Sequence, residues 1–438
     1  SAPLRSPDRP MPRLAPIVLP ALLAARLTAP LSAQAPAPQP VPQPVPQPVP
    51  QPVPQPVPRP AAPAPAAAPA AIPPAPASQG AAWILMDATS GQILAGHAID
   101  TPRAPASLTK VMTSYVVAAE LAAGRIKRDD MVLISERAWR EGGAGTAGSY
   151  SGFDVNTRAP FEKVMTGMVV QSGNDASIAL AEHVAGTQEA FADLMNRYAK
   201  QLGMTNSHFV NAHGLDAEGQ VITARDMAIL ARALIRDFPE AYALHSIKEF
   251  TWNGITQHNR NGLLWKDPSV DGIKTGHTSR AGYNLAASAK RGDMRLISVV
   301  LGVETSNRAD AFRIREGDNL ALLNWGFRFY ETHALFDPAT PLATQPLYKG
   351  EADSVALGVA APLLVTLPRG RYGDLKPVID VPKQIIAPIS EGQTIGTVRV
   401  QLDGQTVAEA PLVARQAVAE AGFFGRLYDE FRLWWNAE

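Results

Sequence analysis

The sequence Ser107-Leu108-Thr109-Lys110 (residues 107–110) stands at the head of an apolar segment that is predicted to be a helix. Apolar residues recur at helical spacing from Ala106 to Leu121, and Pro105 precedes them as at a helix start. Ser107 and Lys110 are three residues apart, so they share one helix face and can touch. A serine hydroxyl is a weak nucleophile that needs a neighbouring base, and Lys110 can be that base only when it is neutral. The alternative is an ordinary first-turn serine beside a solvated lysine.

A second polar motif, Ser172-Gly173-Asn174, interrupts a long apolar region. The residues on either side, Val164 to Gln171 and Ala176 to Val184, are predicted helices. A turn between two buried helices projects polar groups into the interior. We therefore expect Ser172 to relay a proton towards a leaving amine and Asn174 to hold a substrate amide. The alternative is a routine glycine-containing connector between helices.

A third motif, Lys274-Thr275-Gly276, lies in a predicted strand from Val270 to Thr278. Two further strands, Tyr283 to Ala289 and Met294 to Val303, follow it closely in the sequence. The three strands are expected to form an antiparallel meander. The alternative for the motif itself is an exposed hairpin strand without a function.

The residue types of the third motif suit a bound peptide. Gly276 leaves room for a substrate backbone, which main-chain hydrogen bonds along the strand would hold. Thr275 offers a hydroxyl to a terminal carboxylate. Lys274 supplies positive charge, and a second cation near Lys110 also lowers the pKa of that lysine. The backbone N–H groups of Ser107 and His277 are candidates for an oxyanion hole.

The three motifs follow one another with gaps of 65 residues (172 − 107) and 102 residues (274 − 172). In this order they resemble the S-x-x-K, S-x-N and K-T-G motifs of penicilloyl serine transferases. Over residues 80–435 the chain resembles the low-molecular-mass penicillin-binding proteins of the D-alanyl-D-alanine carboxypeptidase type. The segments that carry the resemblance are Arg103 to Thr113, Gln171 to Ala176, Asp271 to Thr278, Asn211 to Leu215 and Asn324 to Arg328.

The resemblance implies an α/β (α+β) fold, with an antiparallel sheet flanked by helices. It implies that Ser107 attacks the penultimate D-Ala carbonyl of peptidoglycan stem pentapeptides, releases the terminal D-Ala and is then freed by water. β-Lactams would mimic the dipeptide and trap Ser107 as inhibitors. An arginine beyond the third motif would meet the substrate carboxylate. Arg315 matches best and Arg308 is its rival, because the loop Glu304 to Ile314 looks longer than usual.

The composition narrows the possible partners and cofactors. The 438 residues carry 40 basic and 40 acidic side chains, a net charge of 0, so nothing favours nucleic acid as a partner. The absence of cysteine excludes disulfides and thiol chemistry. The 8 histidines show no H-E-x-x-H pattern, and we expect neither a metal nor another cofactor.

The N-terminal region is expected to lie outside the catalytic domain. Residues 1–35 resemble a secretory signal, with an apolar stretch from Leu14 to Ala25 that is too short to span a bilayer. An uncleaved N-terminal anchor is the alternative. Residues 36–79 form a proline-rich linker, in which Gln-Pro-Val-Pro repeats from Gln39 to Pro58 favour polyproline II. One interpretation of the linker is a spacer that reaches through the periplasm or the peptidoglycan mesh. The alternative is a low-complexity segment that is tolerated without a function.

The rest of the chain divides into three predicted parts. Residues 80–335 are the catalytic domain, whose first hairpin, Trp83 to Asp87 and Gln92 to Ala95, is expected to join the sheet of the meander. Residues 336–412 are a small β-domain without obvious catalytic groups, which we interpret as a pedestal or partner surface. Residues 413–438 are an amphipathic membrane-anchor helix, and the alternative is a helix docked on its own domain or on a partner. Its apolar side comprises Phe423, Phe424, Leu427, Tyr428, Phe431, Trp434 and Trp435.

Together these features predict a periplasmic D-Ala-D-Ala carboxypeptidase attached peripherally to the outer face of the inner membrane. One alternative is a DD-endopeptidase that cuts peptidoglycan cross-links. Another is a weakly catalytic scaffold that binds peptidoglycan. A class A β-lactamase is disfavoured, because no general-base glutamate motif stands between Ser172 and Lys274.

Overall fold

The computed structural model describes residues 72–143 and 148–435, with the backbone alone for residues 432–435. The predicted signal peptide therefore lies outside the described residues. So does the proline-rich linker up to residue 71.

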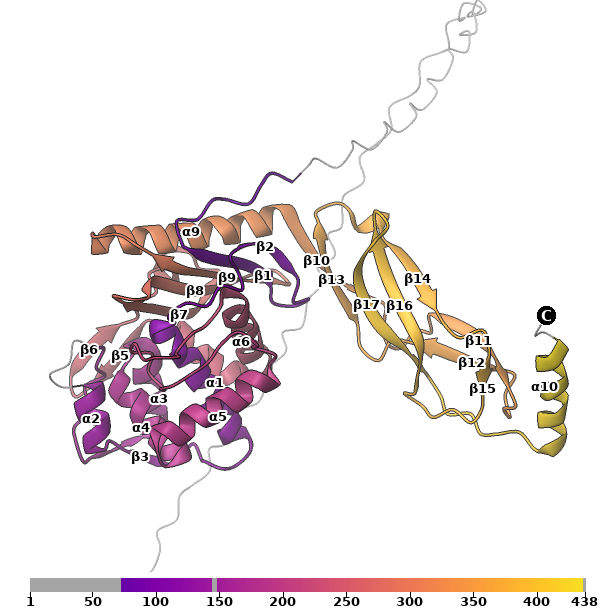
Figure 1. Cartoon of the computed structure of the whole chain (residues 1–438), viewed down its shortest axis with the longest axis horizontal. Coiled ribbons are helices and arrows are strands. Elements are labelled where there is room, and N and C mark those ends of the chain that lie inside the picture. The colour runs from indigo at the N-terminus through magenta and orange to yellow at the C-terminus, as the bar shows by residue number, and fades with distance from the viewer. Residues whose placement is uncertain (1–71, 144–147, 436–438) are drawn as a thin grey trace, which may run out of the picture. The chain divides into compact units, whose positions relative to one another are not determined.

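A five-stranded antiparallel sheet forms the centre of the larger part of the described chain (Figure 1). Its strand order is β2-β1-β9-β8-β7, so the first hairpin joins the meander as predicted. Strand β7 has a strand neighbour on one side only in this sheet, which makes it an edge. The bounds are β1 (Ala82–Asp87), β2 (Ile93–His97), β7 (Val270–Thr278), β8 (Gly282–Arg291) and β9 (Met294–Val303).

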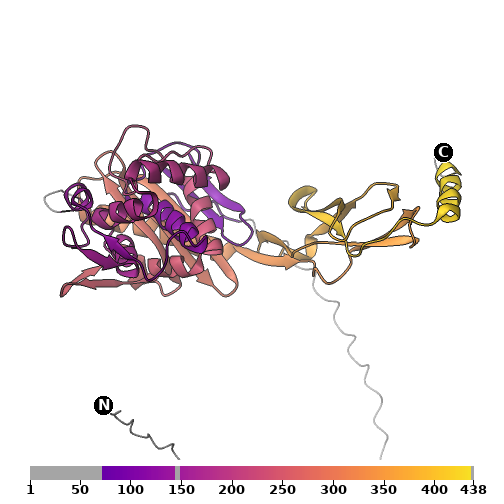
Figure 2. The same ribbon diagram turned by 90° about the horizontal axis from the view of Figure 1, so that it is seen from below.

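Helices cover both faces of this sheet (Figure 1). Helix α9 (Arg308–Phe329) packs on one face through a buried cluster that includes Leu285, Leu296 and Leu322. Figure 2 looks onto the helices of the other face, where α1 (Thr109–Ala122) and α6 (Ala224–Asp237) pack in a larger buried cluster. The antiparallel sheet between helical layers confirms the predicted fold class.

The remaining elements of this part surround the helical layer. Two short hairpins pair β3 (Met131–Leu133) with β4 (Arg158–Pro160) and β5 (Glu249–Trp252) with β6 (Ile255–His258). The helices are α2 (Glu136–Gly142), α3 (Phe161–Val170), α4 (Asn174–Ala185), α5 (Gln188–Gln201), α7 (Pro239–Ala243) and α8 (Leu263–Lys266), with 3-10 turns η1 (Ala106–Leu108) and η2 (Leu244–Ser246).

The helix predicted from Ala106 to Leu121 is in fact two elements. The 3-10 turn η1 carries Ser107, and α1 begins only at Thr109. The prediction of one continuous α-helix is wrong at this point, because the Thr109 N–H donates to the main-chain oxygen of Ala106, the i→i−3 bond of a 3-10 turn. Lys110 therefore lies in the first turn of α1, while Ser107 lies in the turn ahead of it.

The chain runs from α9 into a β-rich part, as predicted. Strand β10 (Tyr330–Leu335) pairs with β13 (Leu363–Pro368), and a second sheet has the order β14-β16-β17-β12-β11-β15. Its strands are β11 (Ala343–Tyr348), β12 (Ser354–Gly358), β14 (Lys376–Asp380), β15 (Ile385–Ile386), β16 (Thr394–Leu402) and β17 (Gln405–Ala414), with a 3-10 turn η3 (Tyr372–Asp374) before β14. Helix α10 (Phe423–Trp435) follows. The domain boundaries given above remain predictions.

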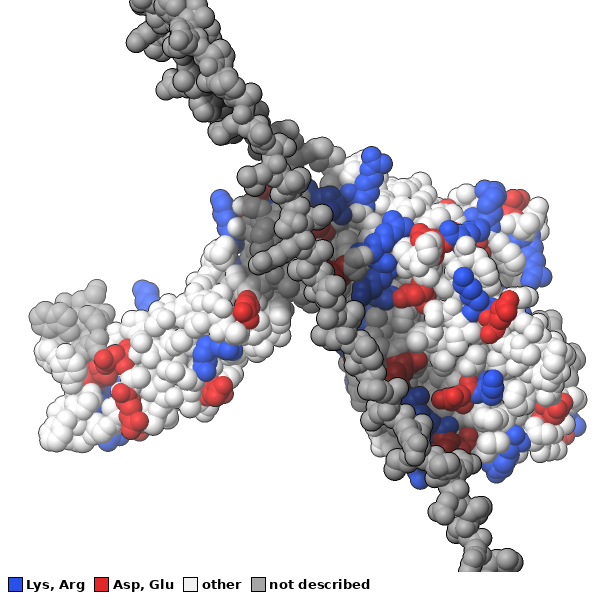
Figure 3. Space-filling model, turned by 180° about the vertical axis from the view of Figure 1, so that it is seen from behind, with Lys and Arg blue, Asp and Glu red and all other residues white. Residues whose placement is uncertain are grey.

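Figure 3 shows basic and acidic side chains interspersed over the face turned towards the viewer. Ion pairs occur among the partly exposed charges of the described residues, as between Arg137 and Glu189 and between Arg225 and Asp100. The mixture of signs on this face agrees with the net charge of 0. This face therefore lacks the continuous basic patch that binds a polyanion such as nucleic acid.

Asn284, on β8, fastens the segment ahead of Ser107 to the sheet. Its fully buried side chain donates from Nδ2 to the main-chain oxygens of Ala104 at 3.2 Å and Pro105 at 3.1 Å. Its Oδ1 accepts the backbone N–H of Gly302, on β9, at 2.8 Å. One amide group therefore satisfies three buried backbone groups and holds the turn η1 against the sheet.

We predict that Asn284→Ala lowers the free energy of unfolding by about 2–4 kcal/mol, because it leaves several buried backbone groups without hydrogen-bond partners. Chemical denaturation of the purified protein measures the loss. The exposed Asn206 provides the control, and Asn206→Ala is expected to stay within about 0.5 kcal/mol of the parent. Equal stability of the two variants would contradict this account of Asn284.

Candidate active site

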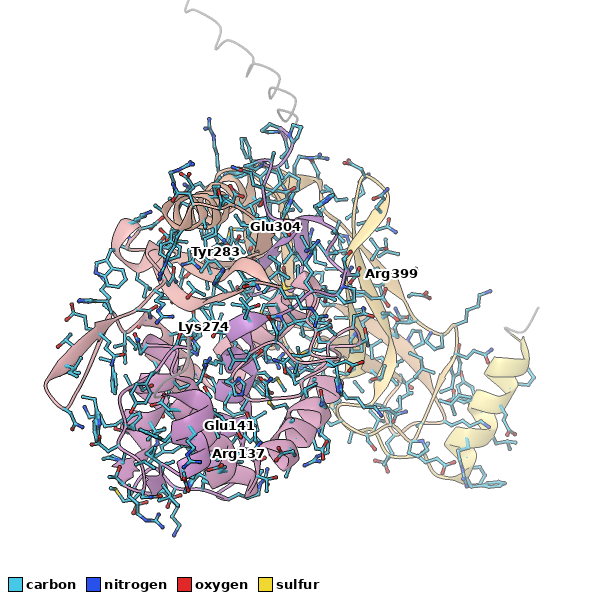
Figure 4. The ribbon with its side chains drawn as sticks, turned by 60° about the vertical axis from the view of Figure 1, so that its left-hand side comes forward. Arg137, Glu141, Lys274, Tyr283, Glu304 and Arg399 are labelled. Atoms are coloured by element: carbon cyan, nitrogen blue, oxygen red, sulfur yellow. The ribbon has the colours of Figure 1, made fainter. Side chains whose placement is uncertain are left out.

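The three sequence motifs meet in one cleft between the turn η1, the α3–α4 connection and strand β7. The cleft has a volume of about 780 Å³, which suits a short peptide. Figure 4 labels Lys274, on β7, and Tyr283, on the neighbouring strand β8. The predicted site residues that line the cleft are Ser107, Ser172, Asn174, Thr275, Gly276, His277 and Arg315.

Lys110 is buried directly behind Ser107. Its Nζ lies 3.0 Å from Ser107 Oγ, 2.7 Å from Asn174 Oδ1 and 2.6 Å from the main-chain oxygen of His213. Burial, and next the positive charge of Lys274, hold the pKa of Lys110 well below its usual range. The expected pairing of Ser107 with Lys110 is therefore present in the geometry.

The three contacts of Lys110 fit a neutral amine. A neutral amine has two hydrogens and one lone pair, and both carbonyl-type oxygens, Asn174 Oδ1 and His213 O, can only accept. The two hydrogens of the amine satisfy these oxygens, and the lone pair then faces Ser107 Oγ. In this arrangement Lys110 is able to accept the proton of the Ser107 hydroxyl.

Ser172 is the strained residue of the second motif. Its φ is 66°, in the left-handed region that non-glycine residues seldom adopt. The side chain is 2% exposed and lines the cleft, yet its Oγ has no hydrogen-bond partner among the described residues. A strained backbone and an unsatisfied buried hydroxyl together are typical of a group that acts on a ligand.

Strand β7 passes directly against the turn that carries Ser107. A Cβ atom on Gly276 would lie 3.0 Å from Ser107 N and 3.0 Å from the main-chain oxygen of Pro105. The glycine is therefore needed for this packing as well as for the predicted substrate approach. Lys274 is buried beside it, with Nζ 3.2 Å from Thr275 O, and burial together with the nearby Arg260 and Arg315 lowers the pKa of Lys274 to about 7.

The segment Asn211-Ala212-His213-Gly214 acquires a role that the sequence did not reveal. Besides His213 O on Lys110, the main-chain oxygen of Ala212 accepts a hydrogen bond from Thr113 Oγ1, on α1, at 2.7 Å. Gly214 has a φ of 93°, and a Cβ there would lie 1.9 Å from Ala106 O. The segment therefore supports η1 and α1 from the side opposite to β7.

The His213 ring has a structural part in the same segment. Its Nδ1 accepts the Leu215 N–H at 3.1 Å, and burial lowers the pKa of His213 to about 3. A neutral ring is thereby fixed in place. No group of three or more metal-ligand side chains occurs in residues 72–143 and 148–435.

Both candidate arginines line the cleft, on one side of helix α9. Arg315 is 2% exposed, donates to the main-chain oxygen of Arg260 at 3.2 Å and has an Nε without a partner among the described residues. Burial lowers the pKa of Arg315 to about 10. Arg308 is exposed at the rim of the cleft.

The segment Glu304 to Ile314 was expected to be a loop. It is largely the first two turns of α9, so that expectation is wrong.

Arg260 is a cleft residue that the sequence reasoning missed. It follows the hairpin β5–β6, lines the cleft and donates to Ser149 Oγ at 2.5 Å. Its charge contributes to the lowered pKa of both Lys110 and Lys274. No short motif surrounds Arg260, and a lone arginine beside a hairpin carries no signal in a single sequence.

The segment 148–154 forms the rim beside the second motif, as expected for the loop Glu141 to Pro160. The Asn174 N–H donates to Ser149 O at 2.8 Å, and the Ser151 N–H donates to Asp175 Oδ1 at 2.9 Å. Gln257 Nε2, on β6, donates to Ser151 O at 3.1 Å. The rim is thus held both by the start of α4 and by the hairpin.

Two family models match the chain. The model described as D-alanyl-D-alanine carboxypeptidase matches residues 69–305. The model described as penicillin-binding protein 5, C-terminal domain, matches residues 330–420. The first match includes the three sequence motifs and the second lies in the β-rich part, whereas Arg308 and Arg315 lie between the two matches.

Curated relatives and a solved structure agree with these matches. The chain is 48% identical over 370 residues to D-alanyl-D-alanine carboxypeptidase DacC of Escherichia coli (strain K12), covering 83% of this chain and 91% of that protein. It is 45% identical over 361 residues to DacA of the same strain, covering 82% and 88%. Penicillin-binding protein 5 from Haemophilus influenzae has a similar structure, with a TM-score of 0.75 at 43% identity, covering 80% of this chain and 100% of that chain.

Proposed function

The chain belongs to the D-alanyl-D-alanine carboxypeptidase family and is a serine-type D-Ala-D-Ala carboxypeptidase; we propose that its reaction runs through an acyl-enzyme on Ser107. The substrates are peptidoglycan stem pentapeptides, and β-lactams are inhibitors that acylate the same serine. The observation that supports this proposal most strongly is the 3.0 Å contact between Ser107 Oγ and the buried Lys110 Nζ.

Acylation begins when Ser107 Oγ attacks the carbonyl carbon of the penultimate D-Ala. Neutral Lys110 takes the proton of the hydroxyl as the C–O bond forms. The N–H groups of Ser107 and His277 stabilise the negative charge on the carbonyl oxygen. Ser172 then passes a proton from Lys110 to the leaving nitrogen, the C–N bond breaks, and D-Ala departs.

Deacylation repeats these steps with water as the nucleophile. Lys110 is again neutral after the first half-reaction, because its proton has left with D-Ala. It takes a proton from the attacking water, and Ser107 recovers a proton when its ester bond breaks. Every proton that Lys110 accepts is returned within one turnover, so no cofactor enters the scheme.

The peptide is held along the edge strand β7. Asn174 binds the substrate amide, and the glycine at position 276 lets the peptide backbone approach. Thr275 and Lys274 meet the terminal carboxylate. An arginine of α9 completes the carboxylate site, and we propose Arg315, with Arg308 as the alternative, because a guanidinium fork matches a carboxylate. The unpartnered Nε of Arg315 supports this choice.

We further propose that the enzyme works in the periplasm, on the outer face of the inner membrane. The proposal rests on the signal-like N-terminus, which lies outside the described residues, and on helix α10. In α10 the side chain of Phe424 is 83% exposed and that of Phe423 is 66% exposed. No helix in the described part of the chain is both long and apolar enough to cross a bilayer.

One side of α10 contacts the β-rich part. Asp429 is buried and its carboxylate accepts the Lys349 N–H at 2.6 Å, while Glu430 pairs with the Lys349 side chain at 2.9 Å. These contacts orient α10, and its exposed aromatic residues then suit the interface of a membrane. In this proposal the β-rich part is the pedestal between anchor and cleft.

The first prediction concerns the chemistry. Incubation with a peptide ending in D-Ala-D-Ala releases one D-Ala per peptide, and penicillin adds one penicilloyl mass to the intact protein. Ser107→Ala abolishes both, and Ser172→Ala slows D-Ala release by roughly 10²–10⁴-fold, the usual contribution of a proton-transfer group. The control Ser246→Ala, at an exposed serine, behaves like the parent.

Two other results would assign a different function to the protein. Faster cleavage of a cross-linked peptide dimer than of the pentapeptide would make the enzyme a DD-endopeptidase. Binding of peptidoglycan without acylation or D-Ala release would make it a scaffold.

The second prediction concerns the membrane. The parent protein sediments with vesicles of zwitterionic phosphatidylcholine, because aromatic burial rather than lipid charge drives binding. The double variant Phe423→Ser/Phe424→Ser loses more than about tenfold in vesicle affinity, since each buried phenyl ring contributes roughly 1.5–3 kcal/mol. The exposed Tyr372, outside α10, provides the control Tyr372→Ser. Unchanged sedimentation of the double variant would rule out α10 as the anchor.

A further inference from the structure

The first two turns of α9 add a wall to the cleft. The side chain of Asn307 caps the helix by accepting the Ala309 N–H at 2.9 Å, and α9 therefore begins at Arg308. Arg308, Phe312 and Arg315 follow at positions i, i+4 and i+7, so they share one face, and all three line the cleft. The two guanidinium groups pack on the same ring, with centroid distances of 5.3 Å for Arg308 and 4.5 Å for Arg315.

The guanidinium group of Arg308 lies near two other cations, Arg260 and Arg315. In the described part of the chain its guanidinium group has neither an ion pair nor a hydrogen bond. After burial, its charge is a cause of the lowered pKa of Arg260 and His277. Like charges gathered at a cleft raise the local concentration of anionic ligands.

Three carboxylates near this wall already accept hydrogen bonds. Glu316 accepts from Lys266 Nζ at 2.7 Å, and Asp310 accepts from Arg313 at 3.2 Å. Asp216, near the end of β7, accepts from Thr278 Oγ1 at 2.8 Å. None of these three groups neutralises Arg308, so the charge of Arg308 is available to a ligand.

The order of the two arginines along α9 matches the course of a bound peptide. Strand β9 ends at Val303, which pairs with Tyr283, and Tyr283 pairs with His277 on β7. The start of α9 therefore lies at the end of the sheet where β7 finishes. Near the other end of α9, a Cβ on Gly326 would lie 2.6 Å from Leu296 Cδ1, so the helix runs back along β9.

The distance between the two arginines along α9 also matches the length of a peptide bound along β7. Seven helical residues from Arg308 to Arg315 span about 10 Å, and three strand residues from Thr275 to Thr278 span about 10 Å. In an extended peptide whose terminal carboxylate lies at Thr275, the third residue from the end is displaced by about 7 Å along β7. An acidic side chain on that residue covers the remaining distance towards Arg308.

We propose that Arg308, supported by Phe312, is a second anion subsite that selects peptides with a carboxylate in the side chain of the third residue from the C-terminus. This inference rests on the proposed function, because it assumes that the terminal carboxylate lies at Thr275 and Arg315. The subsite distinguishes dicarboxylate peptides from peptides in which only the C-terminus is charged.

The test compares two peptides that differ in one group. Nα-acetyl-L-2-aminopimelyl-D-Ala-D-Ala carries the side-chain carboxylate, and its side-chain carboxamide has the same length without the charge. At low ionic strength the parent enzyme is expected to cleave the acid with a kcat/KM roughly tenfold above that of the amide, as befits a charge-assisted contact. In Arg308→Gln the ratio falls to about one.

The matched control is Arg328→Gln, at an exposed arginine on the same helix that is absent from the cleft lining. This variant keeps the ratio of the parent. A ratio near one in the parent, or an unchanged ratio in Arg308→Gln, would overturn the subsite and leave the carboxypeptidase standing. An equal loss for both peptides in Arg308→Gln would assign Arg308 to the terminal carboxylate instead. Release of D-Ala from neither peptide would overturn the proposed function and the subsite with it.

Discussion

Lys110 is buried in contact with three polar atoms that are all uncharged, and the rest of the site depends on this arrangement. The three atoms are Ser107 Oγ, Asn174 Oδ1 and His213 O. A charged ammonium group without an anionic contact is costly in a protein interior, so this environment lowers the pKa of Lys110 and favours the neutral amine. Ordinary serine and lysine side chains thereby become a nucleophile and its base. The neighbouring Lys274 acts in the same direction, and it is also buried.

The surrounding backbone is shaped to keep these atoms together. Ala106 adopts a left-handed φ immediately before Ser107, and two glycines allow other segments to approach the turn that carries Ser107. Gly276 admits strand β7 on one side, and Gly214 admits the segment with His213 on the other. Asn284 ties the turn to the central sheet. The antiparallel sheet and its helical layers therefore position residues from three distant parts of the sequence within hydrogen-bond distance of one another.

The motifs were predictable from the sequence because each has a local pattern. The bounds of β7 match the prediction, although Val270 and Ile273 are its only apolar residues. Arg260 and the carbonyl of His213 were not predictable, because a main-chain oxygen has no residue-type signature and a lone arginine has no spacing. The start of α9 was missed although Asn307 and Asp310 form a recognisable cap and acidic first turn. The predicted signal peptide and the linker up to residue 71 lie outside the described residues and stay predictions.

The pH dependence of Ser107 acylation by penicillin tests the neutral-lysine mechanism most directly. Acylation requires neutral Lys110, and the pKa of this lysine is held well below 10.5. The rate is therefore expected to be level above the lowered pKa of Lys110 and to fall as the pH drops through it, well below 10.5. Lys110→Arg, which keeps the charge but cannot lose the proton, should acylate roughly 10²–10⁴-fold more slowly at every pH. Acylation of Lys110→Arg at the rate of the parent enzyme would contradict the role of Lys110 as the base.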